Sequence, residues 1–64
     1  MRLKVKEIIE LLEADGWFLS RQKGSHKQYK HSTKNGTVTV PGHGKNEELE
    51  HFLVSSILKQ AGLK

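Results

Sequence analysis

The sequence contains no cysteine, which removes two common ways of stabilising a small protein. Without thiols the chain can form neither a disulfide bond nor a zinc site with thiolate ligands. A chain of 64 residues buries only a modest share of its surface, so the apolar side chains have to form the core unaided. The lack of cysteine fits a reducing compartment, and we expect a cytoplasmic protein.

Long apolar runs are missing as well. The residues before Val5 include no apolar segment of the kind found in a secretory signal. No run approaches the roughly 20 apolar residues that a membrane-spanning helix needs. We therefore expect one domain that covers residues 1–64 and has no membrane partner.

Acidic residues are absent from the middle of the chain. The seven carboxylates lie on either side of it: Glu7, Glu10, Glu13 and Asp15 before, and Glu47, Glu48 and Glu50 after. The stretch between them carries only basic charges: Arg21, Lys23, Lys27, Lys30, Lys34 and Lys45. The net charge is +4, and its concentration in the centre indicates a polyanionic partner more clearly than the total does.

The apolar spacing predicts a helix at each end of the chain. Val5, Ile8 and Leu12 belong to one face of a helix over residues 5–14, which we expect to stop at Gly16. The second helix is expected to follow an N-cap at Asn46.

The first turn of that second helix would hold Glu47, Glu48 and Glu50, where the helix dipole favours negative charge. Its predicted apolar stripe comprises Leu49, Phe52, Leu53 and Ile57, and its predicted stop is Gly62.

Three segments between the helices have the composition of strands: residues 17–22, 25–31 and 37–40. Two-residue alternation puts His26, Gln28 and Lys30 on one face of the second strand and Tyr29 on the other. Both helices have one apolar side, and the simplest packing places them on the same face of the sheet.

The predicted fold is therefore α+β, with the order αβββα and two helices on one face of a three-stranded antiparallel sheet. Tyr29, Val38 and Val40 would point toward the helices, and the His26 face would be open to water. Double-stranded-RNA-binding domains have this order too, which is an analogy of fold only.

His26 is the first candidate for chemistry. From spacing alone, the simplest interpretation is an exposed histidine on a basic strand, and spacing favours it. The functional interpretation is general acid or base catalysis, which histidine performs near neutral pH. Neighbouring lysines would then stabilise negative charge on a phosphorane.

His43 is a second candidate, although a loop histidine is the simpler interpretation. In a meander the end of the third strand approaches the start of the second, so His43 could face His26. Cleavage of RNA by its 2′-hydroxyl needs one group to take a proton and another to give one. The four histidines, His26, His31, His43 and His51, match no zinc-binding spacing, and no metal site is expected.

The chain resembles the HicA toxins of HicA/HicB toxin–antitoxin systems. The similarity lies in residues 12–17, 21–31, 37–41 and 57–63, together with His43. Its most specific parts are the Gly24-Ser25-His26 core with an aromatic residue three positions later, and the Ile-Leu-Lys-Gln-Ala-Gly ending.

The resemblance implies a double-stranded-RNA-binding-like fold, ribonuclease activity on mRNA, a HicB antitoxin as partner and His26 as the catalytic residue. Our hypothesis is accordingly a metal-independent endoribonuclease that uses no cofactor. The candidates for RNA binding are Lys23, Ser25, Lys27, Gln28, Lys30 and His43. The alternatives are a non-catalytic RNA-binding module that uses the same face, and a protein-interaction domain with an acidic partner.

Overall fold

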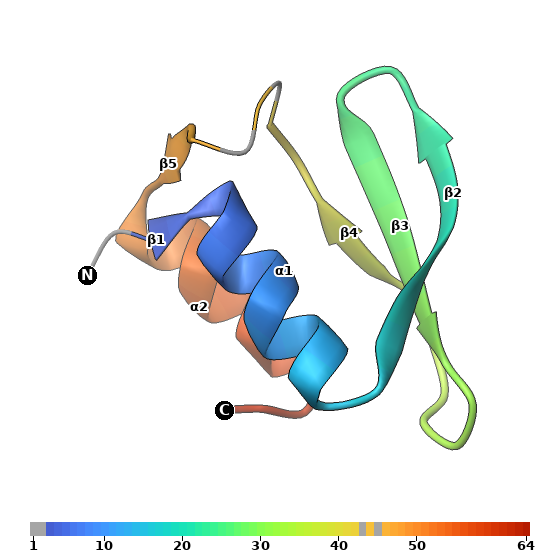
Figure 1. Ribbon diagram of the computed structural model, residues 1–64. Coiled ribbons are helices and arrows are strands. Elements are labelled where there is room, and N and C mark those ends of the chain that lie inside the picture. Colours follow the sequence, from blue (N-terminus) through green and yellow to red (C-terminus); the bar gives the residue numbers. More distant parts are fainter. Residues whose placement is uncertain (1–2, 43, 45) are drawn as a thin grey trace.

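The computed structural model describes residues 3–42, 44 and 46–64. Its elements are β1 (Leu3–Lys4), α1 (Val5–Ala14), β2 (Trp17–Lys23), β3 (His26–His31), β4 (Val38–Val40), β5 (Glu48–Leu49) and α2 (His51–Gln60). β2, β3 and β4 form an antiparallel sheet in that order. Figure 1 shows α1 and α2 side by side on one side of this sheet. The predicted α+β fold with the αβββα order is confirmed, and each predicted strand of the sheet agrees with the structure to within one residue at either end.

The first helix forms as the apolar spacing predicts. Val5, Ile8 and Leu12 are all buried and face the sheet. The Glu7 carboxylate accepts a hydrogen bond from the backbone N–H of Lys4 at 2.8 Å and so satisfies a donor at the helix start. The helix ends at Ala14 with Asp15 as its C-cap, and Gly16 follows with a φ of +102°, which residues with a Cβ rarely adopt.

One continuous core lies between the helices and the sheet. Its buried residues come from both helices and from β2, β3, β4 and β5: Val5, Ile8, Leu12, Trp17, Tyr29, Val38, Val40, Leu49, Val54, Ile57 and Ala61. Leu3 of β1 is partly buried and packs against them. Tyr29, Val38 and Val40 point toward the helices, as two-residue alternation predicts. The opposite side of the sheet faces solvent.

A second, two-stranded sheet was not predicted. β1 pairs with β5 in antiparallel register, with Leu3 opposite Leu49 and Lys4 opposite Glu48. The backbone N–H of Val5 extends this connection by donating to the carbonyl of Glu47 at 2.8 Å. The pairing therefore ties the segment before α1 to the segment before α2.

That pairing makes the predicted start of the second helix wrong. α2 has Glu50 as its N-cap and His51 as its first residue, so the glutamates expected in its first turn precede it. Glu48 and Leu49 are extended because their backbone groups bond to β1. A segment that pairs with a neighbouring strand cannot also take helical dihedrals, and here the strand pairing prevails.

The predicted apolar stripe of this helix is wrong in part. Phe52 is 63% exposed, whereas Val54, Ile57 and Ala61 are the residues that face the core. Leu49 is buried, but from β5 and not from the helix. Because the helix starts at His51, Leu49 is not part of it, and its buried side carries Val54 and Ile57 instead of Phe52.

The C-terminal end of α2 agrees with the prediction. Gly62 has a φ of +73°, and its N–H donates to the carbonyl of Lys59 at 3.1 Å. The N–H of Leu63 donates to the carbonyl of Leu58 at 2.8 Å. These two bonds are those of a Schellman motif, which satisfies the last carbonyls of a helix.

Candidate functional site

The solvent side of the three-stranded sheet gathers the chain's candidate residues. Residues that are direct partners in neighbouring antiparallel strands point to the same face of the sheet. We call this side the outer face, and its residues are Phe18, Arg21, Lys23, His26, Gln28, Lys30 and Thr39. Three of the predicted site residues besides His26, namely Lys23, Gln28 and Lys30, therefore lie on one surface with it.

A β-bulge in β2 changes which basic side chains of that strand point to the outer face. Leu19 lies opposite Tyr29 and so points toward the helices, but the register shifts between Leu19 and Arg21. Arg21 therefore lies opposite Gln28 and points outward, although a regular strand would put it on the same face as Leu19.

Arg21 is the candidate that sequence reasoning missed. Its side chain shares the outer face with His26 because Ser20 is an extra residue in β2. No sequence signal marks the extra residue, because Trp17, Phe18 and Leu19 form a continuous apolar run without alternation.

His26 is the first residue of β3 and lies directly opposite Lys23. The turn before it contains Gly24, whose carbonyl accepts a hydrogen bond from the Gln22 side chain at 3.2 Å. The imidazole of His26 is exposed, and within the described residues it makes no hydrogen bond or ion pair. A ligand on the outer face can therefore contact the ring.

The outer face is cationic. Arg21, Lys23 and Lys30 lie on it, and no carboxylate does. The acidic residues belong to α1 and its C-cap, to β5 and to the residues that flank β5. A surface with this separation of charge attracts polyanions.

Not every predicted site residue lies on this surface. Lys27 points to the helix side, where it lines an open groove with Leu19 and Tyr29 next to α1. Ser25 is half-buried in the turn before β3. His43 lies outside the described residues, although Val40 lies opposite Lys27, so β4 does end beside the start of β3 as expected.

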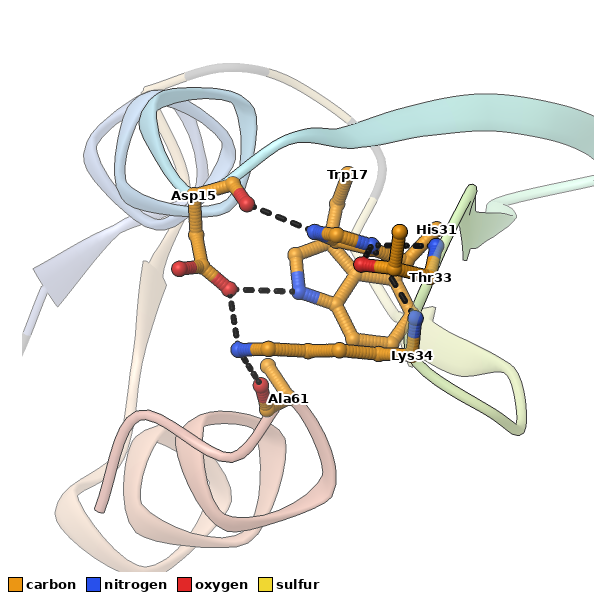
Figure 2. A network of polar contacts seen from close by, with 6 residues as sticks. All are labelled: Asp15, Trp17, His31, Thr33, Lys34 and Ala61. Carbon is orange, nitrogen blue, oxygen red and sulfur yellow. Dashed lines mark hydrogen bonds and ion pairs between the residues drawn. The ribbon is translucent and has the colours of Figure 1, made fainter.

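A second polar cluster joins the C-terminal ends of both helices, as Figure 2 shows. The Lys34 ammonium group donates to the Asp15 carboxylate and, at 3.1 Å, to the carbonyl of Ala61. Asp15 also accepts from the indole N–H of Trp17 at 3.1 Å. Lys34 thus places a positive charge where the dipoles of both helices favour one.

His31 belongs to this cluster, which makes it a structural histidine. Its Nε2 atom lies 2.7 Å from the backbone oxygen of Asp15, and its ring meets that of Trp17 edge to face, with centroids 5.2 Å apart. A Cβ atom at Gly16 would come within 2.8 Å of Nε2. The ring therefore fills the space that a glycine leaves at the end of α1.

Among the residues that the structure describes, Asp15 and Tyr29 have shifted pKa values. The hydrogen bond from Lys34 is the main reason that the pKa of Asp15 lies below its ordinary value of 3.8. Burial raises the pKa of Tyr29, and the negative charge of Glu13 adds to that effect. Both groups lie on the helix side of the sheet, away from the outer face.

The described part of the chain has no cluster of three or more histidine, cysteine, aspartate or glutamate side chains placed to hold a metal ion. Within the same residues, no helix combines the length and apolarity needed to cross a membrane.

Comparison with protein families places this site in context. The family model described as the HicA toxin of bacterial toxin–antitoxin systems matches residues 5–63. The chain belongs to the HicA toxin family. The match includes every strand of the three-stranded sheet and both helices of this HicA family member. Comparison with curated proteins finds no significant match. Membership of a toxin–antitoxin family implies a toxin role and an antitoxin as partner.

Proposed function

We propose that this HicA family chain is an endoribonuclease that cleaves mRNA without a metal ion and uses His26 as its catalytic residue. The observation that carries the proposal is the position of the exposed His26 imidazole on a cationic surface without carboxylates. RNA is a polyanion, so its phosphates match this surface in charge. Histidine is also the side chain best suited to move protons at neutral pH.

The reaction follows from the chemistry of RNA. The 2′-hydroxyl oxygen attacks the neighbouring phosphorus, a new oxygen–phosphorus bond forms, and the bond from phosphorus to the 5′-oxygen breaks. His26 takes the proton of the 2′-hydroxyl or gives a proton to the leaving 5′-oxygen. The products are a 2′,3′-cyclic phosphate on one fragment and a 5′-hydroxyl on the other.

The cations of the outer face hold and stabilise the reacting phosphate. Lys23 lies directly opposite His26, and side chains at such positions are about 5 Å apart at Cβ. Its ammonium group can therefore reach the phosphorane and offset the negative charge that develops there. Lys30 and Arg21 contact phosphates farther along the face, and Gln28, opposite Arg21 and between His26 and Lys30 in β3, adds a hydrogen-bonding group.

The test is cleavage of an end-labelled single-stranded RNA by the purified chain in EDTA. We expect the unmodified chain to cut and His26→Ala to lose about a hundredfold or more of the rate, the range that general acid–base groups contribute. His51→Ala is the matched control, because it removes an exposed histidine from the start of α2. Equal cutting by the unmodified chain and His26→Ala would show that His26 is not catalytic.

Two further results would contradict parts of the proposal. Fragments that end in a 5′-phosphate would exclude attack by the 2′-hydroxyl. Binding of RNA by the unmodified chain and His26→Ala, with cleavage by neither, would favour a non-catalytic RNA-binding module.

The proposal also includes a partner, namely an antitoxin of the HicB type. We expect a HicB-type protein encoded beside the gene of this chain to form a stable complex with it and to suppress its cleavage of RNA. Cleavage that is unaffected by a stoichiometric amount of that protein would contradict this part.

A further inference from the structure

We propose that Phe18 stacks on an unpaired base of the substrate, so that the outer face holds RNA as a single strand. This inference rests on the proposed function and adds a binding subsite to it. The subsite lies on β2, at the end of the outer face away from His26.

The position of Phe18 in β2 aims its ring at solvent. Its two neighbours in the strand, Trp17 and Leu19, lie opposite His31 and Tyr29 on the helix side. Phe18 lies opposite Lys30 and is 51% exposed, whereas Trp17 is 2% exposed. Figure 1 shows β2 at one edge of the sheet and both helices on one side of it. The strand pairing places Phe18 on the other side.

The surroundings of Phe18 distinguish it from an ordinary exposed apolar side chain. Single exposed apolar residues are common on protein surfaces and need no special explanation. Phe18, however, is the aromatic residue of a surface whose charged members, Arg21, Lys23 and Lys30, are all cations. An aromatic ring beside cations is the combination that binds single-stranded nucleic acid, because the ring stacks on a base and the cations hold its phosphates.

A protein partner fits this position less well. The other exposed large apolar side chains of the described residues are Leu11, Leu19, Phe52 and Leu63, and none of them lies on the outer face. Phe18 is therefore not part of an apolar patch of the kind that protein interfaces use. The charge around it is complementary to RNA instead.

The geometry separates the stacked base from the reacting phosphate. His26 and Lys30 are four residues apart on β3, which corresponds to about 13 Å along a strand. The base on Phe18 thus lies to one side of the bond that is cleaved. Within a duplex, both faces of a base are covered by its neighbours, so only an unpaired base can stack on the ring.

The experiment measures the affinity of RNA for the His26→Ala chain, which removes the proposed catalytic group so that the probe stays intact. The probe is a short single-stranded RNA with 2-aminopurine at one position, and the same sequence as a duplex serves for comparison. We expect Phe18→Ala to weaken single-strand binding by about 5- to 150-fold, the range that loss of base–aromatic stacking gives. The quenching of 2-aminopurine fluorescence should be lost with it.

Three further variants separate stacking from simple loss of apolar surface. Phe18→Trp should retain the affinity, because it keeps a π face, and Phe18→Leu should lose it nearly as Phe18→Ala does. Phe52→Ala is the matched control, since it removes a phenylalanine from α2 that is more exposed than Phe18, and it should leave binding unchanged. Circular dichroism of each variant shows whether it is folded.

The outcomes separate this inference from the proposed function. Unchanged single-strand affinity in Phe18→Ala, or full affinity in Phe18→Leu, would overturn the stacking subsite even if the unmodified chain cleaves RNA. Phe18-dependent binding without cleavage by the unmodified chain would support the subsite and overturn the proposed function. An equal loss of duplex and single-strand binding in Phe18→Ala would overturn the preference for unpaired bases.

Discussion

The Nε2 atom of His31 donates a hydrogen bond to the backbone oxygen of Asp15, across a distance of 2.7 Å. A carbonyl oxygen only accepts, so Nε2 carries the proton. The other ring nitrogen, Nδ1, lies 3.0 Å from the backbone nitrogen of Thr33 and 3.2 Å from that of Lys34, and it accepts from both. The ring therefore connects the end of α1 to the loop after β3 and is held as the Nε2–H tautomer.

The first prediction concerns that tautomer. Nitrogen NMR of the imidazole should show a protonated Nε2 and an unprotonated Nδ1 in His31. His31→Phe keeps an aromatic ring beside Trp17 but leaves the loop N–H groups without their acceptor, so the free energy of unfolding should fall by about 1–2 kcal/mol. His26→Phe is the control, and its effect on stability should be small because His26 is exposed. Equal losses from the two variants would contradict the structural role of His31.

The second prediction concerns the ion pair between Lys34 and Asp15. The pKa of Asp15 lies below 3.8 in the folded state, mainly because Lys34 donates a hydrogen bond to it. A carboxyl group with a lowered pKa adds stability that is present above 3.8 and is lost as pH falls through the lowered value. Lys34→Met should therefore be less stable than the unmodified chain at neutral pH and should lose less stability on acidification.

Urea unfolding at neutral pH and at a pH well below 3.8 would measure this difference. Lys30→Met is the matched control, since Lys30 lies on the outer face without a carboxylate beside it. The prediction would be wrong if the stability of Lys34→Met fell as steeply on acidification as that of the unmodified chain.

The third prediction tests the phase of α2. The sequence pattern assigned Phe52 and Ile57 to the same buried stripe, but Phe52 is 63% exposed and Ile57 is 3% exposed. Ile57→Ala should cost about 2–5 kcal/mol through the lost contacts and the remaining cavity. Phe52→Ala should change the free energy of unfolding by no more than about 0.5 kcal/mol, as surface substitutions do. Thermal or urea unfolding measures the stability of both variants. A large loss of stability in Phe52→Ala would show that Phe52 belongs to the buried stripe, as the sequence pattern predicted.

The elements that could be predicted from the sequence are those with a repeated apolar pattern. α1 extends over several turns and stops just before Gly16, so spacing and stop signal agree. β3 alternates around Tyr29, and this alternation correctly places His26, Gln28 and Lys30 on one face. The histidine itself was identified by a motif of the HicA family and not by its spacing.

The features that were missed depend on contacts between distant segments. β1 and β5 are two residues each, which is too short for any periodicity, and only their mutual pairing makes them strands. The acidic residues before α2 match the usual first turn of a helix, yet the pairing with β1 delays the helix to His51. Local propensity is a weak prior, and tertiary contacts override it here.

The bulge in β2 was missed for a related reason. One extra residue leaves no mark on composition, although it decides on which face Arg21 lies. A bulge is determined by the register of the partner strand, and no single-strand pattern reports that register. Sequence reasoning therefore did not assign Arg21 to RNA binding, whereas Lys27, which it did assign, lies in β3 and keeps the face that alternation gives it.

The last prediction compares these two residues. Arg21 lies on the outer face opposite Gln28, whereas Lys27 points into the groove beside α1. In the His26→Ala chain, Arg21→Gln should weaken single-stranded RNA binding, because it removes a cation that the proposed function places on a phosphate. The negative slope of log affinity against log salt concentration should become less steep by about 0.7, the share of one phosphate contact on a single strand. Lys27→Gln removes the same charge from the other face and should leave the slope unchanged. Binding titrations over a series of salt concentrations measure both slopes, and a loss in Lys27→Gln without one in Arg21→Gln would place the RNA on the helix side of the sheet.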